Sequence, residues 1–510
     1  MSENISNNKR IAQNTLFLYF RMILIMGVTL YTSRVILDKL GVEDYGLYQV
    51  VGGVVGMLSF LNGTLSNGTS RFLTYELGAR NHARLQATFS TAFYVHLVLG
   101  LIVFLLMETG GMWFLYHKLV IPPERLTACI WVFQLSILTT LVAITQVPYT
   151  AAIMAHERMG IYAYISIFEA FAKLAVCYLL SVSSFDRLIV YAILIAVVQI
   201  LVAVFYRVYC IRHFSESRLQ KVFDKSIFRG MMGFSGWNIM ANLAETLKLQ
   251  GVLVLINMFF APAVAAAQAV ANQVSNAMMQ FVNNFRSAIN PQIIKLYAAG
   301  NEEASRKLTL QTTVYCFDLI LLLGFPAIII MDELMHLWLV EVPEYAVVFT
   351  QWIIICNIIS TFSASFYVPM MAANRMKSNS IAAVFLGIGQ FVVLYFLLKI
   401  GFGPVWVQYM LFIMTTGFSL IVKPLILHRE INYSAKELLF CYWDCAKVLL
   451  LSSAIIFPAL YLMKDGALLS LTKGVIAFIS VALSSYLFLG KKTKEKLNFF
   501  LLKKVRGIKN

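Results

Sequence analysis

The sequence predicts an all-α integral membrane protein of about fourteen transmembrane helices, with essentially no soluble domain. Of its 510 residues, 60% are hydrophobic and only 13% are charged, whereas a soluble domain carries about 25% charged residues. The mean hydropathy is +0.76, and a water-soluble fold has too little interior to hide so much apolar surface. Lipid must therefore cover the remainder.

Apolar runs define the predicted spans. Each run has about the 20 residues that a helix needs to cross a bilayer, and several are longer, which predicts tilt or protrusion. In order, the spans are 12–36, 46–78, 84–107, 126–152, 159–181, 187–210, 228–257, 262–297, 308–331, 345–371, 379–400, 404–427, 444–463 and 467–489. The first run contains Arg21 and lacks a clear cleavage site, so we expect it to be retained rather than removed as a signal peptide.

The charges between the spans give an orientation. With the N-terminus in the cytoplasm, 28 of the 41 lysines and arginines fall on the inside, 7 fall in outside loops and 6 lie within spans. Lys423 is counted among the inside residues and Arg125 among the outside ones. This bias predicts an even number of spans with both termini in the cytoplasm. The net charge of +16 therefore reflects membrane orientation, and we expect no nucleic-acid partner.

A basic stretch at 211–229 separates the first six spans from the rest. Local sequence recurs across it, because Ala155–Met159 resembles Ala372–Met376 after the corresponding span. Six is an even number, so the two halves would share one orientation as parallel, pseudo-symmetric repeats. The predicted parts are a six-helix bundle at 1–210, a cytoplasmic linker at 211–227, a second six-helix bundle at 228–428, two additional helices at 429–490 and a basic cytoplasmic tail at 491–510.

Five ionisable residues lie inside predicted spans at one depth: Arg21, Arg71, Glu169, Arg286 and Asp318. Counted from the nearest cytoplasmic basic residue, each is roughly 13–17 Å into the membrane. A charge at such depth is costly in lipid and tends to face a cavity or a partner. Guanidinium groups stay charged and bind phosphate through paired hydrogen bonds. The three arginines therefore predict a cavity for an anionic, phosphate-bearing substrate.

Polar stripes on several spans favour the same cavity, because a long polar face is a poor lipid-facing surface. We expect the anionic headgroup to contact Arg21, Arg71, Arg286, Lys248, Asn67, Asn242, Asn276 and Asn283. We expect three acidic residues to serve either as counter-charges or as sites for a coupling ion or proton: Asp318, Glu169 and Glu245.

Simpler interpretations of these charges stay open. Arg71 and Arg286 could extend their side chains to the cytoplasmic interface. Glu169 and Lys173 are four residues apart and could neutralise each other, and Glu245 with Lys248 has a similar alternative. The seven cysteines show no zinc-site or disulfide spacing. We expect no metal, no cofactor and no catalytic residue.

Three short motifs make the sequence similar to Wzx-type polysaccharide flippases. Leu40–Tyr48, between the first two spans, resembles their first-loop pattern. Pro148 through Ala155–Met159, followed by Tyr162, looks like their fourth-to-fifth helix connection. Gly401–Pro404 is similar to their turn before the twelfth helix. The resemblance extends over most of the chain, from about Ile11 to about Gly490.

This resemblance implies the fold of the MOP superfamily, shared by MATE exporters and lipid II flippases, with two six-helix bundles around a V-shaped cavity and two extra helices. It implies alternating access that moves an undecaprenyl-pyrophosphate-linked oligosaccharide from the cytoplasmic to the periplasmic leaflet of the bacterial inner membrane, for O-antigen or capsule biosynthesis. Arg21, Arg71 and Arg286 match the family's cationic pyrophosphate-binding residues by type and location. The arginine cluster on the first helix of lipid II flippases is reduced here to Arg21, which argues against a peptidoglycan precursor.

The partners that follow are the lipid-linked oligosaccharide, membrane lipid and other polysaccharide-assembly proteins, around a monomeric transport unit. The lipid tail would occupy a groove between helices, and the two extra helices offer one such place. A MATE-type multidrug exporter is the nearer alternative, although its cationic drugs suit acidic cavities. A membrane-embedded polysaccharide polymerase or ligase is the other. The longest outside loop, about 108–125, holds no acid–base constellation, so we do not expect an enzyme.

Overall fold

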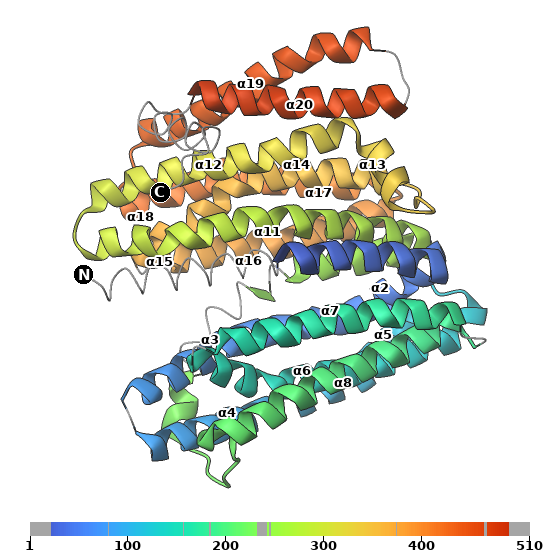
Figure 1. Cartoon of the computed structure of the whole chain (residues 1–510), viewed down its shortest axis with the longest axis vertical. Coiled ribbons are helices and arrows are strands. Elements are labelled where there is room, and N and C mark those ends of the chain that lie inside the picture. The colour runs from blue at the N-terminus through green and yellow to red at the C-terminus, as the bar shows by residue number, and fades with distance from the viewer. Residues whose placement is uncertain are drawn as a thin grey trace, which may run out of the picture. The chain divides into compact units, whose positions relative to one another are not determined.

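A computed structural model describes residues 22–79, 81–156, 158–182, 185–231, 242–243, 246–373, 375–463 and 467–488. Their regular structure is helical throughout, and these residues contain no strand (Figure 1). The helices are α2 (Val42–Gly56), α3 (Phe60–Gly78), α4 (His82–Leu106), α5 (Met112–His117), α6 (Leu126–Ala155), α7 (Met159–Val182), α8 (Arg187–His213), α10 (Val252–Phe259), α11 (Pro262–Ala298), α12 (Glu302–Ile329), α13 (Met331–Trp338), α14 (Ala346–Ser365), α15 (Tyr367–Ala372), α16 (Lys377–Ile400), α17 (Val405–Thr416), α18 (Lys423–Ile431), α19 (Ala435–Leu462) and α20 (Ala467–Phe488). Three π-helical segments among the described residues, η2 (Met107–Gly111), η5 (Leu247–Gly251) and η6 (Gly417–Val422), continue directly into α5, α10 and α18.

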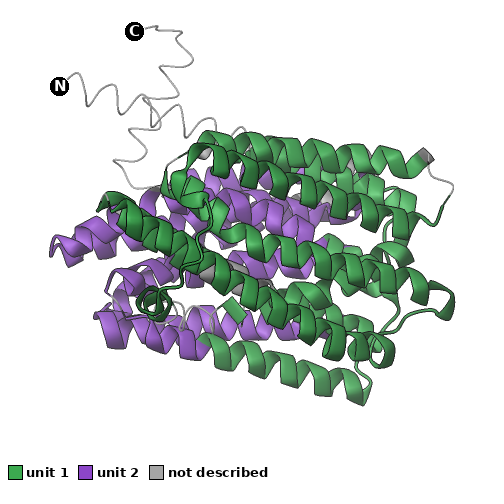
Figure 2. Ribbon diagram, turned by 90° about the horizontal axis from the view of Figure 1, so that it is seen from below, with its two compact units in different colours: residues 1–270, 338–346, 383–404 green, residues 271–337, 347–382, 405–510 purple. Residues whose placement is uncertain are grey.

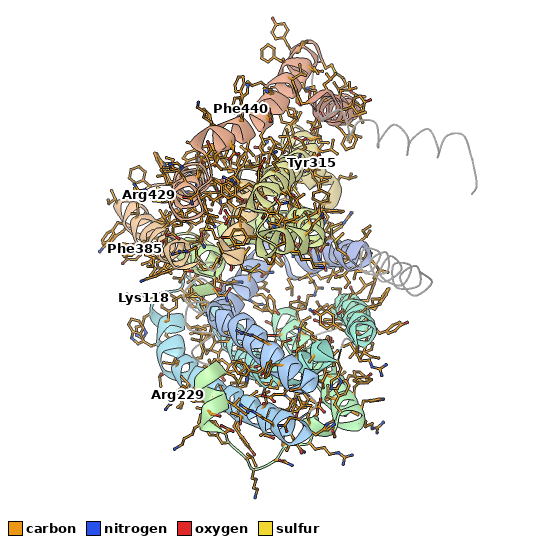
Figure 3. All side chains as sticks on the ribbon, turned by 90° about the vertical axis from the view of Figure 1, so that its left-hand side faces the viewer. Lys118, Arg229, Tyr315, Phe385, Arg429 and Phe440 are labelled. Atoms are coloured by element: carbon orange, nitrogen blue, oxygen red, sulfur yellow. The ribbon has the colours of Figure 1, made fainter. Side chains whose placement is uncertain are left out.

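The chain is a multi-pass membrane protein. Within the described residues, ten helical stretches are long and apolar enough to cross a bilayer. Large apolar side chains are exposed along them, including Phe385 (75%) and Phe440 (66%), both labelled in Figure 3. Such exposure suits contact with lipid. The predicted spans 12–36 and 228–257 lie partly outside the described residues, and 46–78 and 262–297 are not among the ten, so the total of fourteen stays a prediction.

The described chain divides into two compact units, coloured separately in Figure 2. Unit 1 comprises Met1–Val270, Trp338–Ala346 and Ala383–Pro404. Unit 2 comprises Ala271–Leu337, Val347–Ala382 and Val405–Asn510. The compact units thus cut across the sequence repeat, and the division into bundles at 1–210 and 228–428 stays a prediction.

Unit 1 is organised around α6, which packs against α8, α3, α4 and α2. The core on this helix is aliphatic and aromatic, and Phe133 and Ile137 are fully buried together with Leu47 and Val51 of α2. Gly41 precedes α2 with a φ of 81°, a backbone conformation that side chains disfavour. This requirement explains the glycine in the Leu40–Tyr48 motif.

The predicted linker after α8 is fastened to α4. The backbone N–H groups of Gln220 and Asp224 donate to the hydroxyls of Ser90 and Thr91, each at 3.0 Å. Tyr94 returns a hydrogen bond from its hydroxyl to the Gln220 carbonyl at 3.0 Å. This part of the predicted linker is therefore hydrogen-bonded to α4.

In unit 2, the two additional helices α19 and α20 pack against each other and against α12. Gly474 allows α20 to lie close to unit 2's Ile330, because a Cβ atom at this glycine would approach the Ile330 side chain to 2.7 Å. The pair predicted at 429–490 is therefore an integral layer of unit 2.

Candidate functional site

The predicted site residues are divided between the two units. Unit 1 holds Arg71 and Asn67 on α3, Glu169 on α7, Asn242, and Lys248 in η5. Unit 2 holds Asn276, Asn283 and Arg286 on α11 and Asp318 on α12. Arg21 and Glu245 lie outside the described residues. The single cavity predicted to collect all of them stays a prediction.

Arg286 is the best-defined cationic site of unit 2. One terminal amino group of its guanidinium donates to Asn283 Oδ1 at 2.6 Å. The other, Nη1, is buried without a hydrogen-bond partner among the described residues. The Oδ1 atom of Asn290, one helical turn further along α11, is buried and unpartnered in the same way. Buried polar groups are normally satisfied, so unsatisfied atoms at this point are consistent with a place for a ligand.

Lys423 is a second cation in unit 2, and it is only 2% exposed. Its Nζ lies 5.4 Å from the ring centroids of both Tyr367 and Phe418. The two rings give it cation–π stabilisation, but no described carboxylate forms an ion pair with it or with Arg286. Arg286 is near enough to repel Lys423 electrostatically. The pair is thus a concentration of buried positive charge that an anion would relieve.

The sequence reasoning missed Lys423. It counted this lysine among the inside residues although the predicted span runs to 427, whereas the helical span continues over Val405–Ile431 and Lys423 is buried within it. The span continues because η6 leads directly into α18, and the aromatic rings make burial of the charge tolerable. A count of helical depth back from Ile431, rather than a hydropathy boundary, would have found it at a depth similar to that of Arg286.

The two described acidic residues that we predicted as counter-charges, Glu169 and Asp318, lie in different surroundings. Glu169 forms an ion pair with Lys173 at 2.6 Å and accepts a hydrogen bond from Gln199 at 3.3 Å, which is the local pairing that the sequence left open. Asp318 has a buried, unpartnered Oδ1 and is repelled by Asp444 of α19. Asp318 therefore interacts across the α12–α19 contact, and among the described residues no ion pair joins it to Arg286.

Unit 1 joins segments of both predicted halves at the end that we expect to face outside. The buried amide of Asn257 on α10 accepts from the Val120 N–H at 3.2 Å and donates to the Val120 carbonyl at 3.4 Å. Gly46 of α2 lies so close to Pro262 that a Cβ atom would be 2.1 Å from the Pro262 carbonyl oxygen. We call this packing of α2 on α10 and the start of α11 the outer seam.

A charged cluster lies at the same end of unit 1. Arg125 is bidentate to Asp44, with distances of 2.8 and 2.5 Å, and it also reaches Asp186 at 2.6 Å. Burial raises the pKa of the Asp44 carboxyl more than Arg125 lowers it. The hydrogen bonds from Arg125 and from the start of α8, which outweigh partial burial, hold the pKa of Asp186 below its ordinary value of 3.8. One arginine thus ties together the starts of α2, α6 and α8.

Two cavities accompany these charges. A largely apolar groove of about 730 Å³ runs along α19; the described residues that line it are Lys436, Leu439, Phe440, Tyr442, Trp443 and Ala446. A cavity of about 410 Å³ lies in unit 1 at the C-terminal end of α3, which we expect to face the cytoplasm, and its described lining includes Arg71 and Arg84. The first has the character of a site for hydrocarbon and the second that of a site for a polar anion.

The described residues thus form a helical membrane protein in which unit 2 holds basic groups without an ion-pair partner and an apolar groove. Comparison with known proteins identifies the family and the fold. The family described as polysaccharide biosynthesis protein matches residues 39–342, and the chain belongs to this family. No curated protein matches the sequence.

Solved structures define the fold. A lipid II flippase, MurJ, in an inward closed conformation has a TM-score of 0.68 at 12% identity, covering 93% of this chain and 98% of its own. An inward-facing multidrug resistance MATE transporter of the MOP superfamily has a TM-score of 0.62 at 12% identity, covering 80% of this chain and 99% of its own. A MOP superfamily transporter from Pyrococcus furiosus, whose binding pocket is described as of reverse polarity, has a TM-score of 0.57 at 12% identity, covering 82% and 96%. The chain has the MOP superfamily fold, as its resemblance to Wzx-type flippases implied.

Proposed function

We propose that this protein is a flippase for an undecaprenyl-pyrophosphate-linked oligosaccharide, which it moves from the cytoplasmic to the periplasmic leaflet. The observation that carries the proposal is the pair formed by Arg286, whose Nη1 is buried and unpartnered, and the buried Lys423. No described carboxylate forms an ion pair with either of them. A guanidinium stays charged in a water-poor interior, and a second basic side chain close to it favours a ligand with at least two negative charges. Pyrophosphate meets this requirement, and its oxygens can accept hydrogen bonds from the unpartnered Nη1 of Arg286.

The amphiphilic character of the substrate matches the apolar groove of α19 in the same unit. Its described lining is aromatic and aliphatic, with Lys436 as the one charged residue. If this groove holds the polyprenyl tail, only the charged headgroup has to pass through a polar part of the protein. The family of polysaccharide biosynthesis proteins supports a glycan as the cargo.

The proposed direction of transport rests on the orientation that the charge bias predicts. The outer seam lies at the end of unit 1 that we expect to face outside, and α2 packs tightly there on α10 and the start of α11. We further propose an inner-membrane location with both termini in the cytoplasm, a monomeric transport unit, and other polysaccharide-assembly proteins as the source and recipients of the glycan. The product would serve cell-surface polysaccharide such as O-antigen or capsule. Transport, rather than enzymatic catalysis, is the proposed activity.

Substitution of the two cations tests this function. Purified wild type, Arg286→Ala and Lys423→Ala are reconstituted in proteoliposomes with a fluorescent undecaprenyl-pyrophosphate oligosaccharide, and the label in each leaflet is followed. Loss of one charged hydrogen bond costs about 1.5–3 kcal/mol, so we expect translocation to fall about 10- to 100-fold. Arg429→Ala is the matched control, because Arg429 is an exposed cation on the same helix α18 (Figure 3). Wild-type rates in both test variants would remove the basis of the proposal.

Protection of the protein against heat by added ligands distinguishes the flippase from a multidrug exporter. The MATE likeness in fold favours it as the second candidate. We expect the lipid-linked glycan to raise the unfolding temperature of the wild type, and to do so less in the Lys423→Ala variant. Protection by cationic drugs, with none from the glycan lipid, would assign the protein to the exporters instead.

A further inference from the structure

The cavity at the cytoplasmic end of α3 has a composition that phosphate binding alone does not explain. Its described lining is Arg71, Phe72, Tyr75, Glu76, Arg84 and Gly230. Its volume of about 410 Å³ lies within the range of small-molecule sites. Tyr75 is 71% exposed although it borders the cavity. An aromatic ring with its face available, set among charged donors, is a suitable platform for a ligand that is apolar on one face and polar at its edges.

The charged residues of this cavity are held in place. Glu76 is only 5% exposed and forms an ion pair with Nε of Arg84 at 3.1 Å. Arg84 begins its helix beside Asn81, whose side chain caps α4 by accepting from the Arg84 N–H at 3.1 Å. A guanidinium has five N–H donors, so the contact through Nε leaves donors for a ligand. The buried carboxylate thus acts as a positioning group for Arg84.

A pyranose ring has the matching chemistry. One face presents C–H groups that pack on an aromatic ring, and its edge carries hydroxyls that pair with guanidinium and carboxylate groups. Arg71 and Tyr75 are four residues apart on α3 and therefore lie on one face, about 6 Å apart along the axis. This spacing is comparable to the width of one sugar ring, so a phosphate at Arg71 would place its attached sugar over Tyr75.

We propose that this cavity is the subsite for the sugar directly attached to the pyrophosphate, with Tyr75 as the stacking platform and Arg84, fixed by Glu76, as the donor to the sugar hydroxyls. The inference rests on the proposed function and on the role of headgroup residue that the sequence predicts for Arg71. It makes Tyr75 and Arg84 specificity-determining residues: they distinguish glycosylated from bare lipid pyrophosphate.

The test compares two synthetic probes on full-length protein in nanodiscs: farnesyl pyrophosphate, and the same lipid pyrophosphate carrying one N-acetylglucosamine. We expect the wild type to bind the glycosylated probe more tightly. Tyr75→Ala and Tyr75→Leu should weaken this probe about three- to tenfold and leave the bare probe unchanged, because only stacking on the sugar is lost. Tyr75→Phe should retain the preference. Tyr164→Ala is the matched control, since Tyr164 is 63% exposed on α7 and does not line the cavity.

The outcomes separate this inference from the proposed function. Equal affinity of the wild type for the two probes, or equal weakening of both by the Tyr75 variants, would overturn the sugar subsite while leaving the flippase proposal standing. Binding of neither probe by the wild type would overturn both. The Leu variant keeps side-chain bulk, so a loss shared by both alanine and leucine substitutions identifies the aromatic face as the cause.

Discussion

Opening of the outer seam can be forced by one added methyl group. A Cβ atom at Gly46 would lie 2.1 Å from the carbonyl oxygen of Pro262 and 2.7 Å from its carbon. These are backbone atoms, so no side chain can rotate away. For Gly46→Ala, α2 and the start of α11 would have to separate by roughly 1 Å to reach an ordinary contact distance.

The expected magnitude follows from this clash. Overpacking of a close contact costs about 1–3 kcal/mol. This cost destabilises only the state in which the seam is closed. The equilibrium between closed and open seams would therefore shift about 5- to 150-fold towards the open state. Gly389→Ala on α16 is the matched control, because a Cβ atom there meets nothing within 4 Å.

A cysteine at Leu253 reports the seam. Leu253 on α10 is 3% exposed and lies against Gly53 of α2, where an added Cβ atom would be 3.4 Å from its Cδ2. A charged maleimide added from outside should label Leu253→Cys slowly. We expect the labelling rate to rise about 5- to 150-fold when Gly46→Ala is combined with it. The seven native cysteines, six buried and one half-buried, give the background in protein without the reporter. Unchanged labelling together with an unchanged unfolding temperature would refute the tight contact.

Two further predictions concern the same end of unit 1. Asn257→Ala removes both hydrogen bonds to Val120 and leaves backbone groups unsatisfied. We expect a loss of about 1–3 kcal/mol in the free energy of unfolding. An unfolding temperature equal to that of the wild type would contradict a stabilising role for these two hydrogen bonds. Asp186→Asn should lower the unfolding temperature at pH 6. Because the folded-state pKa of Asp186 is lowered, its stabilisation is present above the ordinary pKa and is lost as pH falls through the folded value, so the difference from wild type should shrink as the pH is lowered below about 3.8. A difference that persisted unchanged at low pH would contradict the role of the ionised carboxylate.

Local sequence was a sufficient guide to the class of protein and to most of its helices. The predicted spans 126–152 and 187–210 correspond to α6 and α8 with differences of a few residues. The longer span 404–427 continues to Ile431, because η6 and α18 carry the helix beyond the apolar run. Helix ends depend on capping and packing as well as hydropathy, which is why the boundaries shifted.

The candidate site was only partly predictable. Depth counting identified Arg286, and the structure places Asn283 beside it as a hydrogen-bond partner. The partner of Glu169 was one of two alternatives, and only the positions of Lys173 and Gln199 decided it. Asp318 interacts with Asp444 of a helix more than a hundred residues later, a relation that no local pattern contains.

The sequence alone determined that this is a helical membrane protein, because lipid exposure depends on composition summed along each segment. The uneven distribution of its basic residues also predicts an orientation. Its arginines at one depth also determined that an anionic substrate should be sought. Only the tertiary structure decided that Lys423 is buried between Tyr367 and Phe418 within reach of Arg286. The physical reason is that hydropathy is a property of one segment, whereas the neutralisation of a buried charge depends on which distant helices pack around it and how each is rotated.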